Sequence, residues 1–102
     1  MTKTKTNPQQ LSIIMGQLLK RAKLNPNLRQ TAKLPRGLNI TCKYHKGLMG
    51  VQLSRPKVWP SDKEVEIVVS HMPPSMQAEG VHSRKEFGKD GVNYIQLYFE
   101  VE

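Results

Sequence analysis

The sequence predicts an α+β fold, in which an N-terminal amphipathic helix packs on one face of a four-stranded antiparallel sheet. Three observations predict it: a helical apolar stripe over residues 8–23, a two-residue turn at Lys46-Gly47, and alternating apolar residues over 64–72 and 92–101. A chain of 102 residues suits one small domain. We expect a flexible basic tail over residues 1–6 and a single α+β domain over 7–102.

The helix is predicted from its two ends and its apolar stripe. Asn7 suits the N-cap and Pro8 the first helical position, where the missing N–H costs nothing. Asn25-Pro26 ends the helix, and residues 27–36 fit either a further helical turn or an extended basic linker. The apolar stripe consists of Leu11, Ile14, Met15, Leu18, Leu19 and Ala22.

The segment LNITCKYHKGLMGVQLS predicts a hairpin, because glycine readily takes the positive φ that a two-residue turn at Lys46-Gly47 requires. The turn places His45 opposite Leu48. One face is then apolar, with the pairs Tyr44–Met49, Cys42–Val51 and Ile40–Leu53. The other face has the pairs Asn39–Ser54, Thr41–Gln52 and Lys43–Gly50. The turn and the polarity are independent constraints that give the same register.

Two more strands complete the expected sheet. Residues 64–72 alternate Val65, Ile67 and Val69 with mostly polar residues and predict the third strand. Residues 75–90 read as a long connection with one helical turn near 76–79 and a turn at GKDG. The last strand, over 92–101, directs Ile95, Leu97, Phe99 and Val101 to one face. The helix should cover the apolar face, which leaves the polar face in water.

The cysteine content, the apolar runs and the N-terminal composition bear on the compartment in which the protein functions. Cys42 is the only cysteine, so no intramolecular disulfide can form, and its place on the apolar face predicts a buried, unreactive thiol. No apolar run approaches the roughly 20 residues of a membrane span. The acid-free N-terminus resembles a transit peptide in composition, but its bases are mostly lysine. We therefore expect a cytoplasmic protein.

Charge is the strongest functional signal. Residues 1–61 contain twelve Lys or Arg and no Asp or Glu, whereas residues 62–102 contain eight acids and four bases. Such a field, with no carboxylate to neutralise it, favours phosphate binding. A basic surface kept only for solubility is the alternative, although such surfaces usually mix both signs. The predicted nucleic-acid-binding residues are Lys20, Arg21, Lys23, Arg29, Lys33, Arg36, Lys43, Lys46, Arg55 and Lys57.

Three aromatic residues are candidates for stacking on bases. Tyr94 and Tyr98 fall on the expected wet face of the sheet, where Tyr rings can stack on unpaired bases. Cross-strand pairing within the protein is the alternative explanation of these tyrosines, and the sequence favours it. Trp59 lies in a basic connection and serves either as a stacking residue or as an anchor for its own loop.

Catalysis, metals and cofactors find little support in the sequence. His71 and His82, with a nearby base, would suit a small ribonuclease, yet no spacing binds the histidines together. One Cys and three dispersed His provide no metal-ligand spacing, and no phosphate-binding glycine loop occurs. We therefore predict binding without catalysis, metal or cofactor.

The predicted function is nucleic-acid binding, DNA or RNA, with low sequence selectivity, because no base-reading recognition helix is evident. The alternative is an inhibitor or adaptor that binds an acidic protein partner, since both ligands require the same field. The last strand, if it lies at the sheet edge, also offers a surface for pairing with a second copy.

Overall fold

The structure, a computed structural model, describes residues 8–101. A 3-10 turn at Pro35–Gly37 links the first two strands. The elements in chain order are α1 (Pro8–Leu24), β1 (Gln30–Lys33), β2 (Asn39–His45), β3 (Leu48–Pro56), α2 (Asp62–Ser70), α3 (Pro74–Glu79), β4 (Ser83–Lys89) and β5 (Val92–Glu100). The predicted flexible tail and the Asn7 N-cap lie outside the described residues.

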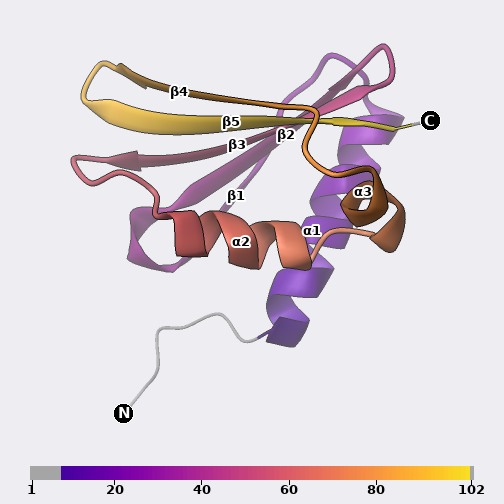
Figure 1. Cartoon of the computed structure of the whole chain (residues 1–102), viewed down its shortest axis with the longest axis horizontal. Helices are drawn as coiled ribbons and strands as arrows, with labels where there is room; N and C mark the ends of the chain where they lie inside the picture. The colour runs from indigo at the N-terminus through magenta and orange to yellow at the C-terminus, as the bar shows by residue number, and fades with distance from the viewer. Residues whose placement is uncertain (1–7, 102) are drawn as a thin grey trace.

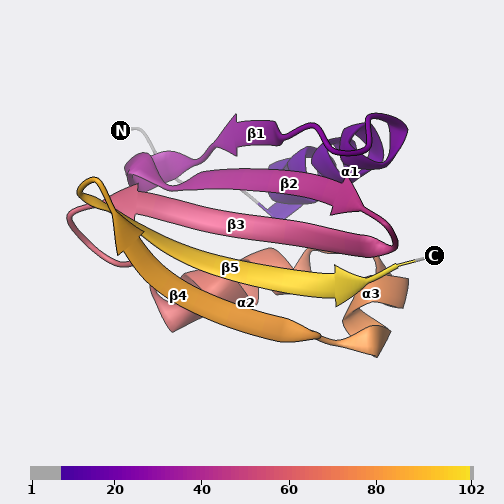
Figure 2. The same cartoon turned by 90° about the horizontal axis from the view of Figure 1, so that it is seen from above.

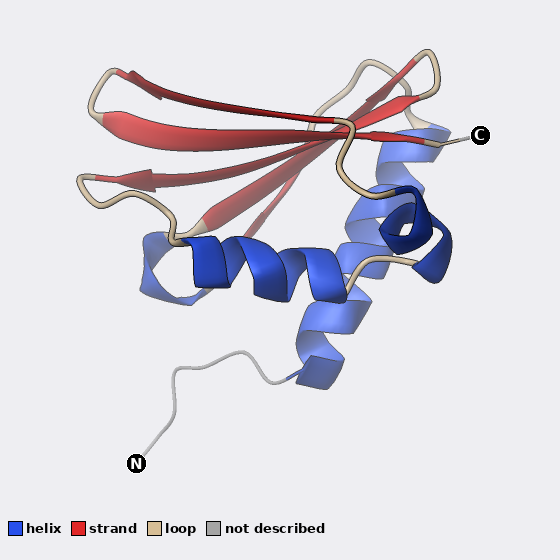
Figure 3. Cartoon of the chain, in the orientation of Figure 1, coloured by secondary structure: helices blue, strands red, loops and turns tan. Residues whose placement is uncertain are grey.

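The molecule has two layers. One is a five-stranded antiparallel sheet in the order β1-β2-β3-β5-β4. The other contains all three helices, which lie on the same side of the sheet (Figures 1 and 3). Figure 2 looks onto the opposite side, where none of the helices described within residues 8–101 covers the strands. We call these the helix-covered face and the open face.

The predicted N-terminal helix is confirmed. Met15, Leu18, Leu19 and Ala22 of α1 are buried, so these residues of the apolar stripe face the sheet as expected, while the side chain of Leu11 lies outside the described part of the chain. Arg21 and Lys23 lie in its last turn, where their charge complements the helix dipole. No helix in the described part of the chain is long and apolar enough to cross a membrane.

The predicted hairpin is also confirmed, pair by pair. His45 lies opposite Leu48, Lys43 opposite Gly50, and Ile40 opposite Leu53. Lys46 and Gly47 occupy the turn with φ of 48° and 83°, the positive values that a tight two-residue turn requires.

The predicted third strand is wrong: residues 62–70 form the helix α2. Ser61 caps it, because its Oγ accepts a hydrogen bond from the Glu64 N–H at 3.1 Å while the Glu64 carboxylate accepts one from the Ser61 N–H at 2.8 Å. Val65 and Val68 are buried at helical spacing, whereas Ile67 is 42% exposed. The capping box and this spacing outweigh the period-two alternation.

The sheet has five strands rather than four, because one predicted strand is the helix α2 and two further strands were not predicted. β1 comes from the ambiguous segment 27–36, and β4 from the expected connection 75–90, which does contain the expected helical turn as α3. Residues 90 and 91, within GKDG, form the turn between β4 and β5. The last strand, β5, lies between β3 and β4, so it is not the edge strand we expected; β1 and β4 are the edges.

The core lies between the two layers. From the strands it takes Ile40, Val51, Leu53, Leu97 and Phe99, all 1% exposed or less. Cys42 lies among them as predicted, and burial raises the pKa of its thiol to about 12. The thiol therefore stays protonated and unreactive at neutral pH.

Candidate nucleic-acid interface

The open face is the polar side of the same strands that build the core. Side chains alternate along each strand, and paired residues share a face, so the registers fix which residues lie there. Three adjacent cross-strand rows result. They are Lys43–Gly50–Tyr98–Ser83, Thr31–Thr41–Gln52–Gln96–Lys85 and Lys33–Asn39–Ser54–Tyr94–Phe87.

The two layers differ in charge. Among the described strand residues, the open face carries Lys33, Lys43, Lys85 and Lys89, with Glu100 as its only carboxylate. Acids gather in the opposite layer instead: Asp62, Glu64 and Glu66 on α2, Glu79 on α3 and Glu86 on the helix-covered face of β4. A polyanion that approaches the open face therefore meets a positive surface with few carboxylates.

A shallow hollow of ≈ 270 Å³ lies on the open face above Gly50; we call it the sheet hollow. A Cβ on Gly50 would lie 3.1 Å from Gln96 Nε2 and 3.4 Å from Tyr98 Cε1, so these side chains lean over the bare backbone of β3. Basic, aromatic and amide groups thus meet around one depression. Its lining is Arg29, Thr41, Lys43, His45, Leu48, Gly50, Gln52, Gln96 and Tyr98.

The three candidate stacking residues have different surroundings. Tyr94 stacks on Phe87 of β4, with ring centroids 4.9 Å apart and an interplanar angle of 16°. Tyr98 lies opposite Gly50 and Ser83, neither of which offers an aromatic ring, and it lines the sheet hollow. Trp59 is 45% exposed and lines a depression with Asp62 and Arg84, on the helix-covered side and away from the two tyrosines.

The predicted basic residues separate into groups. Arg29, Lys33 and Lys43 lie on or beside the open face. Lys20, Lys23 and Lys46 line a groove of ≈ 950 Å³ between α1, the β2–β3 turn and α3, which we call the hairpin groove. Lys23 Nζ also lies 5.9 Å from the ring centroid of Tyr44. Arg21 is exposed on α1 and donates to the Gln17 carbonyl at 3.4 Å.

The hairpin groove is amphipathic. Its apolar lining comes from Leu19, Leu48, Met49, Met76 and Val101, and its charged lining includes Glu79 and Glu100 as well as the three lysines. Leu48 also lines the sheet hollow. The two depressions are therefore neighbours around the β2–β3 turn, and the basic residues of both follow one path around this end of the sheet.

The remaining predicted bases lie at the other end of the sheet. Arg55 forms an ion pair with Glu64 and donates to the Arg36 carbonyl at 3.0 Å. Burial raises the pKa of Glu64, but hydrogen bonds from Arg55 and Ser61 outweigh it and hold the pKa below its usual value. Because the Arg55 guanidinium is paired with the Glu64 carboxylate, Arg55 does not belong to the candidate interface. Lys57 lies close by, in the turn after β3, with a φ of 70°.

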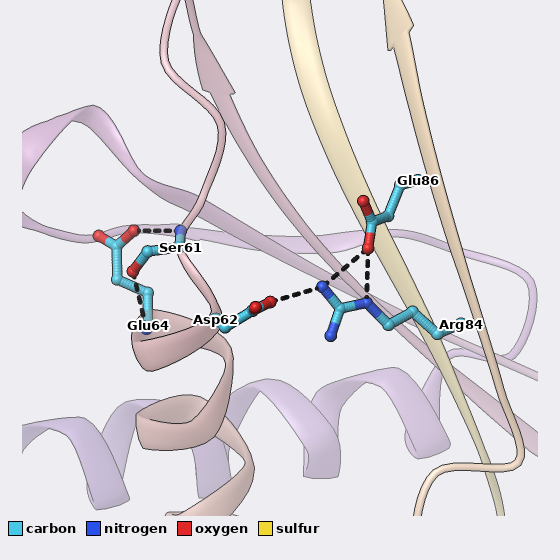
Figure 4. A network of polar contacts seen from close by, with 5 residues as sticks. All are labelled: Ser61, Asp62, Glu64, Arg84 and Glu86. Atoms are coloured by element: carbon cyan, nitrogen blue, oxygen red, sulfur yellow. Dashed lines mark hydrogen bonds and ion pairs between the residues drawn. The ribbon is translucent and has the colours of Figure 1, made fainter.

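An ion-pair network joins the layers at the start of α2 (Figure 4). Arg84 of β4 contacts Asp62 at 2.9 Å and Glu86 at 2.8 Å. Hydrogen bonds with the two carboxylates raise the pKa of Arg84 above its ordinary value. Arg84 therefore serves the contact between α2 and β4, on the side away from the lysines of the open face.

The histidines do not meet. His71 donates to the Ile67 carbonyl at 2.8 Å, His82 lies 3.4 Å from Glu100, and His45 is hydrogen-bonded to Asn27. His82 lines the hairpin groove and His45 the sheet hollow, while His71 lines neither. Within residues 8–101, no three His, Cys, Asp or Glu side chains group as metal ligands. The ribonuclease hypothesis gains no geometric support.

The sequence placed Gly50, Gln52 and Gln96 on polar strand faces but did not show that they line one hollow. It missed Lys85, Phe87 and Lys89, which belong to the unpredicted strand β4. A local signal existed only for the hairpin residues, whose register was foreseen. No family model, curated protein or solved structure matches this chain.

Proposed function

We propose that this protein binds nucleic acid through the open face of its sheet, with low sequence selectivity. One observation carries the proposal: the open strand face has four lysines and a single carboxylate, whereas the acids gather in the opposite layer. Nucleic acids present closely spaced phosphates, and lysine contacts release the counterions condensed on them.

The basic path suggests how a long ligand continues beyond the sheet. Arg29 and Lys43 line the sheet hollow, Lys46 lies at the turn, and Lys20 lines the neighbouring hairpin groove. A strand of nucleic acid on the open face would extend around the β2–β3 turn toward the last turns of α1. The helix-end bases predicted from the sequence then form the second half of the same interface.

Fluorescence anisotropy with labelled single- and double-stranded DNA and RNA, repeated over a salt series, tests the proposal. Binding should persist at about 0.15 M ionic strength for at least one polymer, with a log–log slope that corresponds to several phosphates. Lys43→Glu should weaken binding, whereas Lys63→Glu on α2 should not. Loss of binding to all four polymers at this salt concentration would contradict the proposal.

An acidic peptide partner is the second candidate, favoured by the hairpin groove. Its apolar lining, with Leu19, Met49 and Met76, and its lysines suit a segment that carries both apolar and acidic side chains. Lys20→Glu and Lys46→Glu should weaken such a peptide, while Lys33→Glu on the distant edge strand should not. An acidic amphipathic peptide that binds wild type and the Lys20→Glu variant equally would exclude this candidate.

A further inference from the structure

Gly50 is unusual for its position. It lies in β3, a central strand, where glycine weakens a sheet because it costs entropy and packs no side chain. Its φ is not positive, so the backbone conformation does not require glycine. What glycine provides here is space, because a Cβ would approach Gln96 and Tyr98 at 3.1 and 3.4 Å. The groups that approach this bare backbone are the side chains of Gln96 and Tyr98 themselves, which lie low over Gly50 and form the lining of the sheet hollow with it.

The groups around this space are those that recognise a base. The half-buried Tyr98 provides an aromatic ring, and the facing amides of Gln52 and Gln96 provide donors and acceptors. Lys43 lies directly across from Gly50, and Arg29 lines the same hollow, so positive charge borders the ring on one side. At ≈ 270 Å³ the hollow lies below the roughly 300–1,000 Å³ of pockets that enclose whole small ligands. It suits one flat ring of a larger chain.

We propose that the ligand of this face is single-stranded nucleic acid, and that the sheet hollow holds one unpaired base, stacked on Tyr98 above Gly50. The inference rests on the proposed function and specifies it. Lys43 and Arg29 contact phosphates beside the stacked base, and the two amides contact its edge.

Geometry excludes a duplex from the hollow. In a double helix the flat faces of the bases are covered by their neighbours, so a ring that lies on a sheet reaches them only when the strand is unpaired. The amides of Gln52 and Gln96 rotate freely enough to satisfy different base edges, which agrees with low sequence selectivity. Tyr94 is a poorer platform than Tyr98, because Phe87 already stacks on it.

Two variants test the site with one matched control. Tyr98→Leu removes the ring and keeps an apolar strand residue. Gly50→Ala adds a methyl group to the floor of the hollow; its closest contact is the mobile end of Gln96, so the sheet should tolerate it. Gly88→Ala is the control, because Gly88 is a strand glycine whose added Cβ would find only ordinary contacts, at 3.6 Å or more, on the helix-covered face. Circular dichroism and thermal unfolding verify that each variant is folded.

Anisotropy is measured with single-stranded RNA, single-stranded DNA, the corresponding duplexes, and inorganic polyphosphate, which has phosphates but no bases. We expect wild type to bind a single strand more tightly than either duplex; the tighter of the two single strands identifies the natural polymer. Tyr98→Leu should weaken that binding about fivefold or more, the low end of measured stacking contributions. Gly50→Ala should also weaken it, Gly88→Ala should not, and polyphosphate affinity should stay constant throughout.

The measurements distinguish a failure of the stacking site from a failure of nucleic-acid binding by the open face. If wild type binds single strands and duplexes equally and neither Tyr98→Leu nor Gly50→Ala changes affinity, the stacking site is refuted while phosphate binding by the open face stands. If wild type binds none of the nucleic acids, both proposals are refuted. Equal losses for polyphosphate and single strands in Tyr98→Leu would also refute stacking, because polyphosphate has no base to stack.

Discussion

The two faces of the sheet are made by the same strands but differ in almost every physical property. On the helix-covered face of β2, β3 and β5, Ile40, Leu53 and Phe99 are fully buried. One residue earlier in each of these strands, the open face carries Asn39, Gln52 and Tyr98, whose side chains remain partly exposed. The helix-covered face builds the core, whereas the open face contributes cross-strand side-chain contacts, such as the Tyr94–Phe87 stack, and remains accessible to a ligand.

This contrast teaches that the charge asymmetry along the chain is only partly a charge asymmetry in space. The basic N-terminal half contributes α1 to the layer of helices and β1, β2 and β3 to the sheet. The acidic half contributes α2 and α3 but also β4, whose Lys85 and Lys89 lie on the open face. The strand alternation, rather than position in the sequence, decides which charges lie on the open face.

The largest loss of stability should come from a substitution on the helix-covered face. Phe99→Ala should reduce the free energy of unfolding by about 3–5 kcal/mol, because it leaves a cavity in the centre of the core. Urea denaturation followed by circular dichroism measures the loss. Gln52→Ala on the open face should cost far less, and similar losses for the two variants would remove the distinction between the faces.

The next effect concerns binding. The triple change of Lys33, Lys43 and Lys85 to Ala should lower nucleic-acid affinity about 10- to 100-fold at moderate salt. It should also reduce the log–log salt slope by about 2, since each lost contact with a single strand contributes about 0.7. Anisotropy over a salt series measures both, and Lys63→Ala on α2 is the control. An unchanged slope in the folded triple variant would show that these lysines do not contact phosphates.

A smaller loss of stability is expected from a substitution at the N-terminus of α2. Ser61→Ala removes the side-chain half of the capping box and should cost about 1 kcal/mol of unfolding free energy. Thermal and urea unfolding measure it. Nucleic-acid affinity should not change, because Ser61 belongs to the helix layer; a parallel loss of affinity would mean that the interface extends there.

The smallest effect should be the contribution of Glu64 to the pH dependence of the unfolding free energy. The folded state lowers the pKa of Glu64 below its ordinary value of 4.5, so ionised Glu64 contributes stability above that value, and the contribution is lost as pH falls through the folded pKa. Glu64→Gln should therefore destabilise the protein at pH 7, and the difference from wild type should shrink with acidification. Urea midpoints at pH 7, 4 and 3 test this; a difference that grows toward low pH would contradict the sign.

The hairpin could be predicted because a local turn and a local polarity pattern independently required the same register. Residues 64–72 were misassigned because Val65 and Val69 fit both a strand and a helix. The capping box of Ser61 and Glu64 was the signal in the sequence that distinguishes them. The strands β1 and β4 gave no apolar alternation, because edge strands bury little: of β4, only Phe87 is even partly buried.

The candidate site was less accessible to sequence analysis than the fold. The wet face and its two tyrosines were foreseen, as was the basic hairpin. The sheet hollow depends on the pairing of β3 with β5, which brings Gly50 next to Tyr98 across 48 positions of the chain. No local pattern encodes such a pairing. The helix-end bases were predicted from charge alone, which could not show that they lie in a different layer from Lys43.

Mapping the bound surface by NMR tests the central claim most directly. Isotope-labelled protein is titrated with a short single-stranded oligonucleotide, and amide shifts are followed residue by residue. The account predicts shifts concentrated at Lys43, Gly50, Gln96 and Tyr98, weaker shifts around Lys46 and Lys20, and none on the exposed face of α2. Shifts centred on α2 and α3, or no shifts at saturating oligonucleotide, would contradict it.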